Sequence, residues 1–105
     1  LRTYLFSKDV SLLDEPFSAL DAITKDEMHD WYMNMRRKYK TSTIFITHDV
    51  DEAILLSDRI YILGDGGIKT EIKIETSVRD NSFKLTKEFL DYKKSVIGCL
   101  EGGKI

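Results

Sequence analysis

Residues 10–21 read VSLLDEPFSALD. The run 10–13 is mostly apolar, and two carboxylates follow it directly, Asp14 and Glu15. A second short run, 43–46, is rich in β-branched residues. Both runs are typical of strands that are buried on two faces, as in a parallel sheet.

A helical pattern lies between these two runs. Its apolar side chains recur at three- and four-residue steps, which predicts one packed helix face made of Met28, Trp31, Tyr32, Met35 and Tyr39. Thr24 and Glu27 have the spacing of a capping box at the start, and basic residues near 36–40 suit the carboxyl end. Strand, helix and strand together predict a βαβ unit with parallel strands and a right-handed crossover.

The second half of the chain predicts further short elements. Asp49 can cap a helix over 50–57, and a strand follows at 60–63. The turn sequence GDGG at 64–67 precedes a segment in which Ile68, Thr70, Ile72 and Ile74 alternate with charged residues, as in an antiparallel hairpin with one wet face.

A last helix is expected at about 86–97, with Phe89, Leu90, Val96 and Ile97 on one side and two glycines, Gly102 and Gly103, after its end. The predicted fold class is therefore α/β. It combines a βαβ unit with a C-terminal antiparallel hairpin and helix. We expect a single partial domain over 1–105, with 76–105 as a helical tail.

The overall composition excludes several classes of partner. Sixteen basic and eighteen acidic side chains leave a net charge of −2. The chain therefore lacks the excess of positive charge that favours binding to nucleic acid or to an anionic membrane. No apolar run approaches the roughly 20 residues that cross a bilayer. We expect a soluble chain in a reducing cytoplasm, with the single cysteine, Cys99, as a small buried apolar group and His29 at the surface.

Polar residues capable of chemistry follow the two predicted parallel strands. Ligands in α/β sheets bind outside the carboxyl ends of such strands, so Asp14 and Glu15 should share one edge with His48 and Asp49. Adjacent carboxylates point in different directions, and one can hold a hard cation or its waters while the other faces a reacting water. Taken alone, the carboxylate pair would be a solvated strand end, and His48 a residue that caps the next helix.

The full set of motifs resembles a known family. Residues 11–21, followed by Thr47-His48-Asp49 and Asp51-Glu52-Ala53, resemble the second half of an ABC transporter ATPase. The resemblance is close up to about residue 63. Beyond it, the segment near 83–96 resembles the nitrate, sulfonate and taurine importer branch. It implies a truncated domain of the P-loop NTPase type.

The resemblance also implies roles for individual residues. Asp14 matches the Walker B aspartate, which holds Mg²⁺ through water, and Glu15 matches the catalytic glutamate that orients or deprotonates the attacking water. His48 matches the switch histidine of the H-loop, which contacts the γ-phosphate of ATP. Ser18 and Asp21 match the D-loop, which meets a second ATPase subunit in the family, with Asp21 as the expected contact.

The same resemblance implies a cellular setting. The cofactors would be ATP and Mg²⁺, and the partners a membrane permease and a second ATPase subunit, with no nucleic acid and no direct membrane insertion. The protein would be cytoplasmic and peripheral, at the inner face of the cell membrane. The transported solute is not encoded in these motifs.

The chain departs from the family pattern in several places. It contains no glycine-rich loop followed by lysine and serine or threonine, no Q-loop and no Leu-Ser-Gly-Gly signature, and Ser11 interrupts the usual apolar strand. We expect the chain to begin just after the signature and to hydrolyse no appreciable ATP alone, because positioning and phosphate neutralisation supply most of the catalysis.

In the family that this chain resembles, the strand before the phosphate loop lies between the strands at 43–46 and 60–63. Its absence would leave a slot there. We expect the chain either to close this slot or to self-associate through the open strand edge. A monomer by light scattering with a fully paired sheet would count against association.

Two other functions stay open at this point. The fold could serve as a non-catalytic dimerisation or docking module, in which case no nucleotide should stabilise it even beside a phosphate-binding half. An ABC-type ATPase of DNA repair or chromosome maintenance shares the same motifs. The acidic balance and the short segment between Asp21 and His48, with no room for a long coiled coil, disfavour this class.

Overall fold

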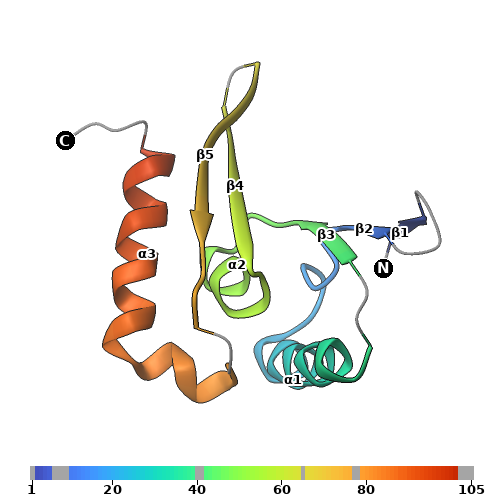
Figure 1. Ribbon diagram of the computed structural model, residues 1–105. Coiled ribbons are helices and arrows are strands. Elements are labelled where there is room, and N and C mark those ends of the chain that lie inside the picture. Colours follow the sequence, from blue (N-terminus) through green and yellow to red (C-terminus); the bar gives the residue numbers. More distant parts are fainter. Residues whose placement is uncertain (1, 6–9, 40–41, 65, 77–78, 102–105) are drawn as a thin grey trace. The chain divides into compact units, whose positions relative to one another are not determined.

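The computed structural model describes residues 2–5, 10–39, 42–64, 66–76 and 79–101. These residues form two compact units, Leu1–Asp49 and Val50–Ile105 (Figure 1). Among the described residues, no helix is both long and apolar enough to cross a membrane. The expectation of a single domain stays a prediction.

The first unit contains a three-stranded sheet and one helix. Its elements are β1 (Arg2–Leu5), β2 (Val10–Asp14), α1 (Ala22–Lys38) and β3 (Ser42–Ile46), and the strand order is β1-β2-β3. The pair β2 and β3 is parallel, with Leu12 opposite Ile44, so the predicted βαβ unit is confirmed. Strand β1, which the sequence patterns did not predict, runs antiparallel to β2.

The prediction that both parallel strands are buried on two faces is wrong for β3. Thr43 and Phe45 are half-buried, whereas Ile44 and Ile46 keep 54% and 45% of their surface exposed. The reason is that α1 is the one helix described in this unit, and it covers a single side of the sheet (Figure 1). Since β3 is the last strand of its sheet in the described part of the chain, one of its edges is open.

The predicted packed face of α1 is only partly right, because Met28, Tyr32 and Met35 are half-buried but the most buried residues lie beside them. His29 is 2% exposed and Met33 is buried, whereas Trp31 is 53% exposed and Tyr39 is an exposed residue beyond the helix end. The ring of Phe17 packs edge-on against His29, which brings a neighbouring face of the helix inward.

The start of α1 differs from the prediction as well. The helix begins after Asp21, so Thr24 and Glu27 lie inside it and form no capping box at its start. Its last turn is basic, as expected.

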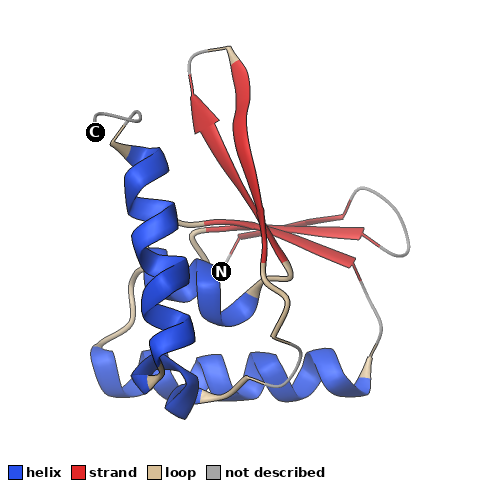
Figure 2. Ribbon diagram, turned by 60° about the vertical axis from the view of Figure 1, so that its left-hand side comes forward, coloured by secondary structure: helices blue, strands red, loops and turns tan. Residues whose placement is uncertain are grey.

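The second unit contains a short helix, a hairpin and the C-terminal helices. Its elements are α2 (Val50–Leu56), β4 (Arg59–Gly64), β5 (Gly67–Lys73), the 3₁₀ helix η1 (Asn81–Leu85) and α3 (Lys87–Leu100). The strands form the predicted antiparallel hairpin, with Ile60 opposite Ile72 (Figure 2).

The alternation predicted for β5 holds only over part of the strand. Thr70 and Ile72 are half-buried and their neighbours exposed, but Ile68 is 66% exposed. The ladder shifts register between Ile62 and Leu63, which places Ile68 rather than Lys69 opposite Leu63. A one-residue shift moves a side chain to the other face, so the simple alternation ends there.

Helix α3 packs against α2, η1 and β4, and it supplies much of the core of this unit. Thr86 caps its start by accepting a hydrogen bond of 3.1 Å from the backbone N–H of Phe89. Phe89 and Val96 are buried, while Leu90 and Ile97, predicted on the same face, are 48% and 38% exposed.

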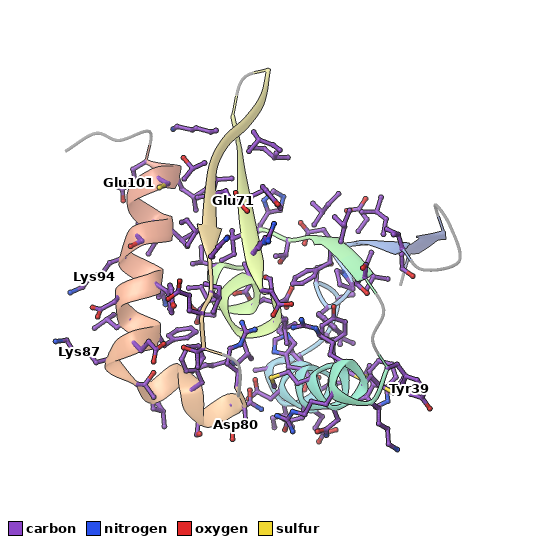
Figure 3. The ribbon with its side chains drawn as sticks, in the orientation of Figure 1. Tyr39, Glu71, Asp80, Lys87, Lys94 and Glu101 are labelled. Carbon is purple, nitrogen blue, oxygen red and sulfur yellow. The ribbon has the colours of Figure 1, made fainter. Side chains whose placement is uncertain are left out.

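The opposite side of α3 is solvated. Lys87 and Lys94 point away from the hairpin (Figure 3). Cys99 is half-buried rather than buried, and the predicted stop at Gly102 and Gly103 lies outside the described residues.

A buried arginine links the segment after the hairpin to the end of α2. Arg79, only 6% exposed, donates to the carbonyl of Ile54 at 2.9 Å, to the carbonyl of Ser57, and to Oδ1 of Asp58 at 3.0 Å. These carbonyls lie at the C-terminal end of α2, where helix groups lack partners of their own. A cation is favoured there by the helix dipole, so Arg79 fastens the segment after the hairpin to the end of α2.

Candidate functional site

The structure brings Glu15 and His48 together at one rim of the first unit. The parallel register places Asp14 opposite Ile46, and the N–H of Glu15 extends the ladder by donating to the carbonyl of Ile46 at 2.8 Å. Beyond these strand ends, Nε2 of His48 lies 3.3 Å from Oε1 of Glu15. The predicted meeting of the carboxylate and the imidazole at a common edge is therefore present.

The two partners differ in their exposure to water. The His48 side chain is 95% exposed, whereas the Glu15 side chain is 29% exposed. Such an exposed pair contributes little to stability, about 0–1 kcal/mol. The arrangement is thus better suited to binding or chemistry than to holding the fold together.

The backbone of Glu15 has an unusual conformation. Its φ angle is 49°, and among the described residues it is the one non-glycine with positive φ. This region costs about 1–3 kcal/mol and persists where the surroundings enforce it. Pro16 makes the conformation more unusual still, because a residue before proline favours extended backbone.

Ser18 holds the turn that follows Glu15. Its backbone N–H and its side-chain Oγ both approach the carbonyl of Glu15, at 3.4 and 3.2 Å. Sequence reasoning found Ser18 as part of a motif but gave no signal for this local contact. The turn directs the chain away from β2 just after the two carboxylates.

Asp14 and Asp21 frame this turn. Asp14 is the half-buried last residue of β2, and Asp21 precedes α1. The exposed Asp21 carboxylate makes no capping hydrogen bond to the helix. It stands at a position where an N-cap bond is normal, so its carboxylate is available to another group.

Two features of the site were missed by sequence reasoning. Nζ of Lys25 lies 3.8 Å from Oδ2 of Asp49, which links the first turn of α1 to the segment after β3. Beneath the rim, the ring of Phe17 contacts the rings of His29 and Tyr32, and Tyr32 in turn contacts Phe45. The buried Phe17 follows Glu15 by two residues, and only tertiary packing identifies its partners.

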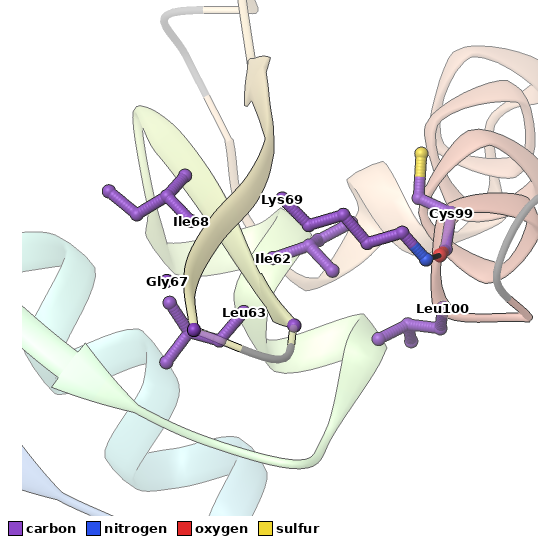
Figure 4. A pocket seen from close by; sticks show the side chains of 9 residues that line it. Ile62, Leu63, Gly67, Ile68, Lys69, Cys99 and Leu100 are labelled. Carbon is purple, nitrogen blue, oxygen red and sulfur yellow. Dashed lines mark hydrogen bonds between the residues drawn. The ribbon is translucent and has the colours of Figure 1, made fainter.

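The second unit has a hollow of its own, of about 660 Å³, between the tip of the hairpin and the end of α3 (Figure 4). Apolar side chains such as Leu63 and Ile68 line much of it. Nζ of Lys69 donates to the carbonyl of Cys99 at 3.1 Å across it. Among the described residues that line this hollow, there is no acid–base pair comparable to Glu15 and His48.

Comparison with known proteins identifies relatives of one kind, although no protein-family model matches the chain. The chain is 52% identical over 64 residues to an aliphatic sulfonates import ATP-binding protein of Pseudomonas syringae, covering 61% of this chain and 24% of that protein. It is 39% identical over 102 residues to a Bacillus cereus protein of the same name, covering 97% of this chain and 41% of that protein.

A third relative carries a different substrate in its name. The formylaminopyrimidine import ATP-binding protein of Halalkalibacterium halodurans is 37% identical over 105 residues, covering 95% of this chain and 42% of that protein. The chain thus spans less than half the length of these relatives, and the last two of the three match almost all of it. It belongs to the family of ABC importer ATP-binding subunits.

Proposed function

We propose that this chain is part of an ATP-hydrolysing subunit of an ABC importer, in which hydrolysis drives solute uptake through a membrane permease. The observation that carries the proposal is the 3.3 Å contact between Glu15 and His48 beyond two parallel strands. Catalytic sites of α/β folds occupy this position. The importer ATP-binding relatives supply the reaction class.

Glu15 and His48 would divide the work on the triphosphate. The Glu15 carboxylate, half-shielded from solvent, would orient or deprotonate the attacking water. The exposed imidazole of His48 would contact the γ-phosphate and report its presence. Their proximity means that one bound γ-phosphate can lie within reach of both side chains.

Asp14 would hold Mg²⁺, through water. Among the described residues there is no cluster of three or more His, Cys, Asp or Glu that could enclose a metal ion. Mg²⁺ ordinarily keeps several waters and takes one or two carboxylates plus substrate phosphates, and a single carboxylate at a strand end fits that pattern. When bound, the ion would neutralise charge on the β- and γ-phosphates.

Ser18 and Asp21 would form the Walker B-proximal D-loop, which meets a second ATPase subunit. Both residues are exposed, and the Asp21 carboxylate makes no cap bond to α1. The partners would be this second subunit and the permease, at the cytoplasmic face of the membrane. The names of the relatives suggest small organic solutes, with aliphatic sulfonates as the first class to assay.

The proposal can be tested by joining the chain to the N-terminal part of the Bacillus cereus relative, which in this family carries the phosphate loop. The joined protein should hydrolyse ATP, and Glu15→Gln should lower turnover by about 10²–10⁴-fold, the usual contribution of a general base. Glu71→Gln, an exposed carboxylate of the hairpin, is the matched control and should leave turnover unchanged. The chain alone should show no turnover.

Unchanged turnover after Glu15→Gln would refute the catalytic role. The alternative, a non-catalytic docking module, is favoured by the open edge of β3 and the exposed Ile44 and Ile46. It would stand if ATP failed to raise the melting temperature of the joined protein, because a ligand that binds the folded state must stabilise it.

A further inference from the structure

A row of four rings lies beneath the rim of the first unit and connects its two catalytic candidates. Phe17, on the turn after Glu15, contacts His29 with ring centroids 5.0 Å apart and Tyr32 at 6.2 Å. Tyr32 contacts Phe45 of β3 at 6.1 Å. All three contacts are edge-to-face, the favoured arrangement of aromatic rings.

The row joins the turn after β2 to strand β3. Phe17 lies two residues after Glu15, and Phe45 lies three residues before His48. Helix α1 supplies Tyr32, the ring between them, and also His29, which contacts Phe17. The Glu15 turn is thus tied to the end of β3 in two ways, directly by the strand ladder and its Glu15–Ile46 hydrogen bond, and through the rings on this helix.

Phe17 anchors the turn by its buried ring. It is 3% exposed and Pro16 beside it is also buried, whereas Ser18 and Ala19 are exposed and Leu20 is only half-buried. The hydrogen bonds from Ser18 to the Glu15 carbonyl are long and solvent-exposed, at 3.4 and 3.2 Å, so they cannot hold the positive φ of Glu15 alone.

We infer that Phe17 is a positioning residue that acts through Glu15: its buried ring fixes the turn that aims the Glu15 carboxylate at His48. The inference rests on the proposed role of Glu15 in ATP hydrolysis. Phe17 itself would touch neither nucleotide nor water. Phe17 would hold the Glu15 carboxylate in place even though the backbone conformation of Glu15 is an unfavourable one.

The test measures the geometry directly, without nucleotide. The chain has two histidines, so two imidazole Cε1–Hε1 signals are expected by NMR, and His48→Gln assigns them. Glu15→Gln should shift the His48 signal, because the two side chains are 3.3 Å apart. This shift is then measured again in the Phe17→Leu, Phe17→Ala and Met33→Ala backgrounds.

Phe17→Ala should remove most of the His48 shift. Phe17→Leu keeps a large apolar side chain at the same buried position and should retain part of the shift. Met33→Ala is the matched control, since Met33 is buried on α1, the helix that supplies His29 and Tyr32, and is not one of the four rings. It should lower the melting temperature and leave the shift intact, which separates positioning from general destabilisation.

A full His48 shift in folded Phe17→Ala, or an equal loss in Met33→Ala, would overturn the inference. If Phe17→Ala does not fold, a full shift in Phe17→Leu overturns it and a reduced one supports it. Because no ATP is present, these outcomes are independent of the hydrolysis assay. A joined protein that failed to hydrolyse ATP would reject the proposed function and leave the NMR result standing.

Discussion

Two turns in this chain end a strand with left-handed backbone, and they do so with different residues. In the hairpin of the second unit, the positive φ angles fall on Gly66 and Gly67, at 87° and 151°. After β2 in the first unit, the positive φ of 49° falls on Glu15. Glycine adopts this region at no steric cost, and glutamate does not.

The difference is the one expected between a turn that serves folding and a turn that serves the proposed chemistry. At the hairpin, residue type and backbone agree, which is the rule for segments whose task is folding. At Glu15 the residue type conflicts with the backbone, and such conflicts are expected where a side chain is retained for chemistry. The comparison therefore supports a role for Glu15 that the local structure alone would not select.

The largest effect is expected at the hairpin. Gly66→Ala should destabilise the chain by about 1–2 kcal/mol, the cost of left-handed backbone for a residue with a Cβ atom. The loss would come from strain alone, since an added Cβ meets nothing within 4 Å. Urea unfolding monitored by circular dichroism measures it.

Gly98→Ala is the control for this change. An added Cβ at Gly98 also meets open space, but Gly98 lies inside α3 without a positive φ. It should stabilise the chain by about 0.5–1 kcal/mol, because glycine weakens helix interiors. If Gly66→Ala left the free energy of unfolding unchanged, or changed it as Gly98→Ala does, the contrast between the two turns would be lost.

A smaller effect of opposite sign is expected at Glu15. Glu15→Asn should be more stable than Glu15→Gln by about 0.5–1 kcal/mol, because asparagine tolerates left-handed backbone better than longer side chains. Both changes remove the charge, and the shorter asparagine also loses its reach to His48, which works against the expected difference. A midpoint in urea for Glu15→Asn at or below that of Glu15→Gln would show that the strain argument fails.

The smallest effect is expected at Ser18. Ser18→Ala removes the hydroxyl that donates to the Glu15 carbonyl, and it should cost about 0.5 kcal/mol, the low end for a hydrogen bond, since this one is exposed. Ser18→Thr keeps the hydroxyl and serves as the control. A loss as large as that of Gly66→Ala would mean that Ser18, rather than Phe17, is the principal anchor of the turn.

The parts of the fold that follow from local pattern were predictable from the sequence. The strands of the βαβ unit, the hairpin turn and the last helix carry their own signals in apolar runs, glycines and helical spacing. The meeting of Glu15 with His48 also followed, because parallel neighbours bring their carboxyl ends together.

The parts that depend on tertiary packing were not predictable. His29 reads as a polar surface residue, and it is buried because Phe17 lies against it. Trp31 reads as a core residue at helical spacing, and it is half exposed because the neighbouring face turns inward. The left-handed backbone of Glu15 and the register shift near Lys69 have no sequence signal of their own.

The contacts of Arg79 should help the second unit to tolerate a break in its chain. Arg79 follows the hairpin in the sequence, and it binds Ile54, Ser57 and Asp58, which precede the hairpin. If a protease nicked the tip between Gly64 and Gly67, the two pieces would still be fastened by this guanidinium and by the β4–β5 ladder. The tip is therefore a place where a loop or reporter sequence can be inserted while the C-terminal helix stays docked.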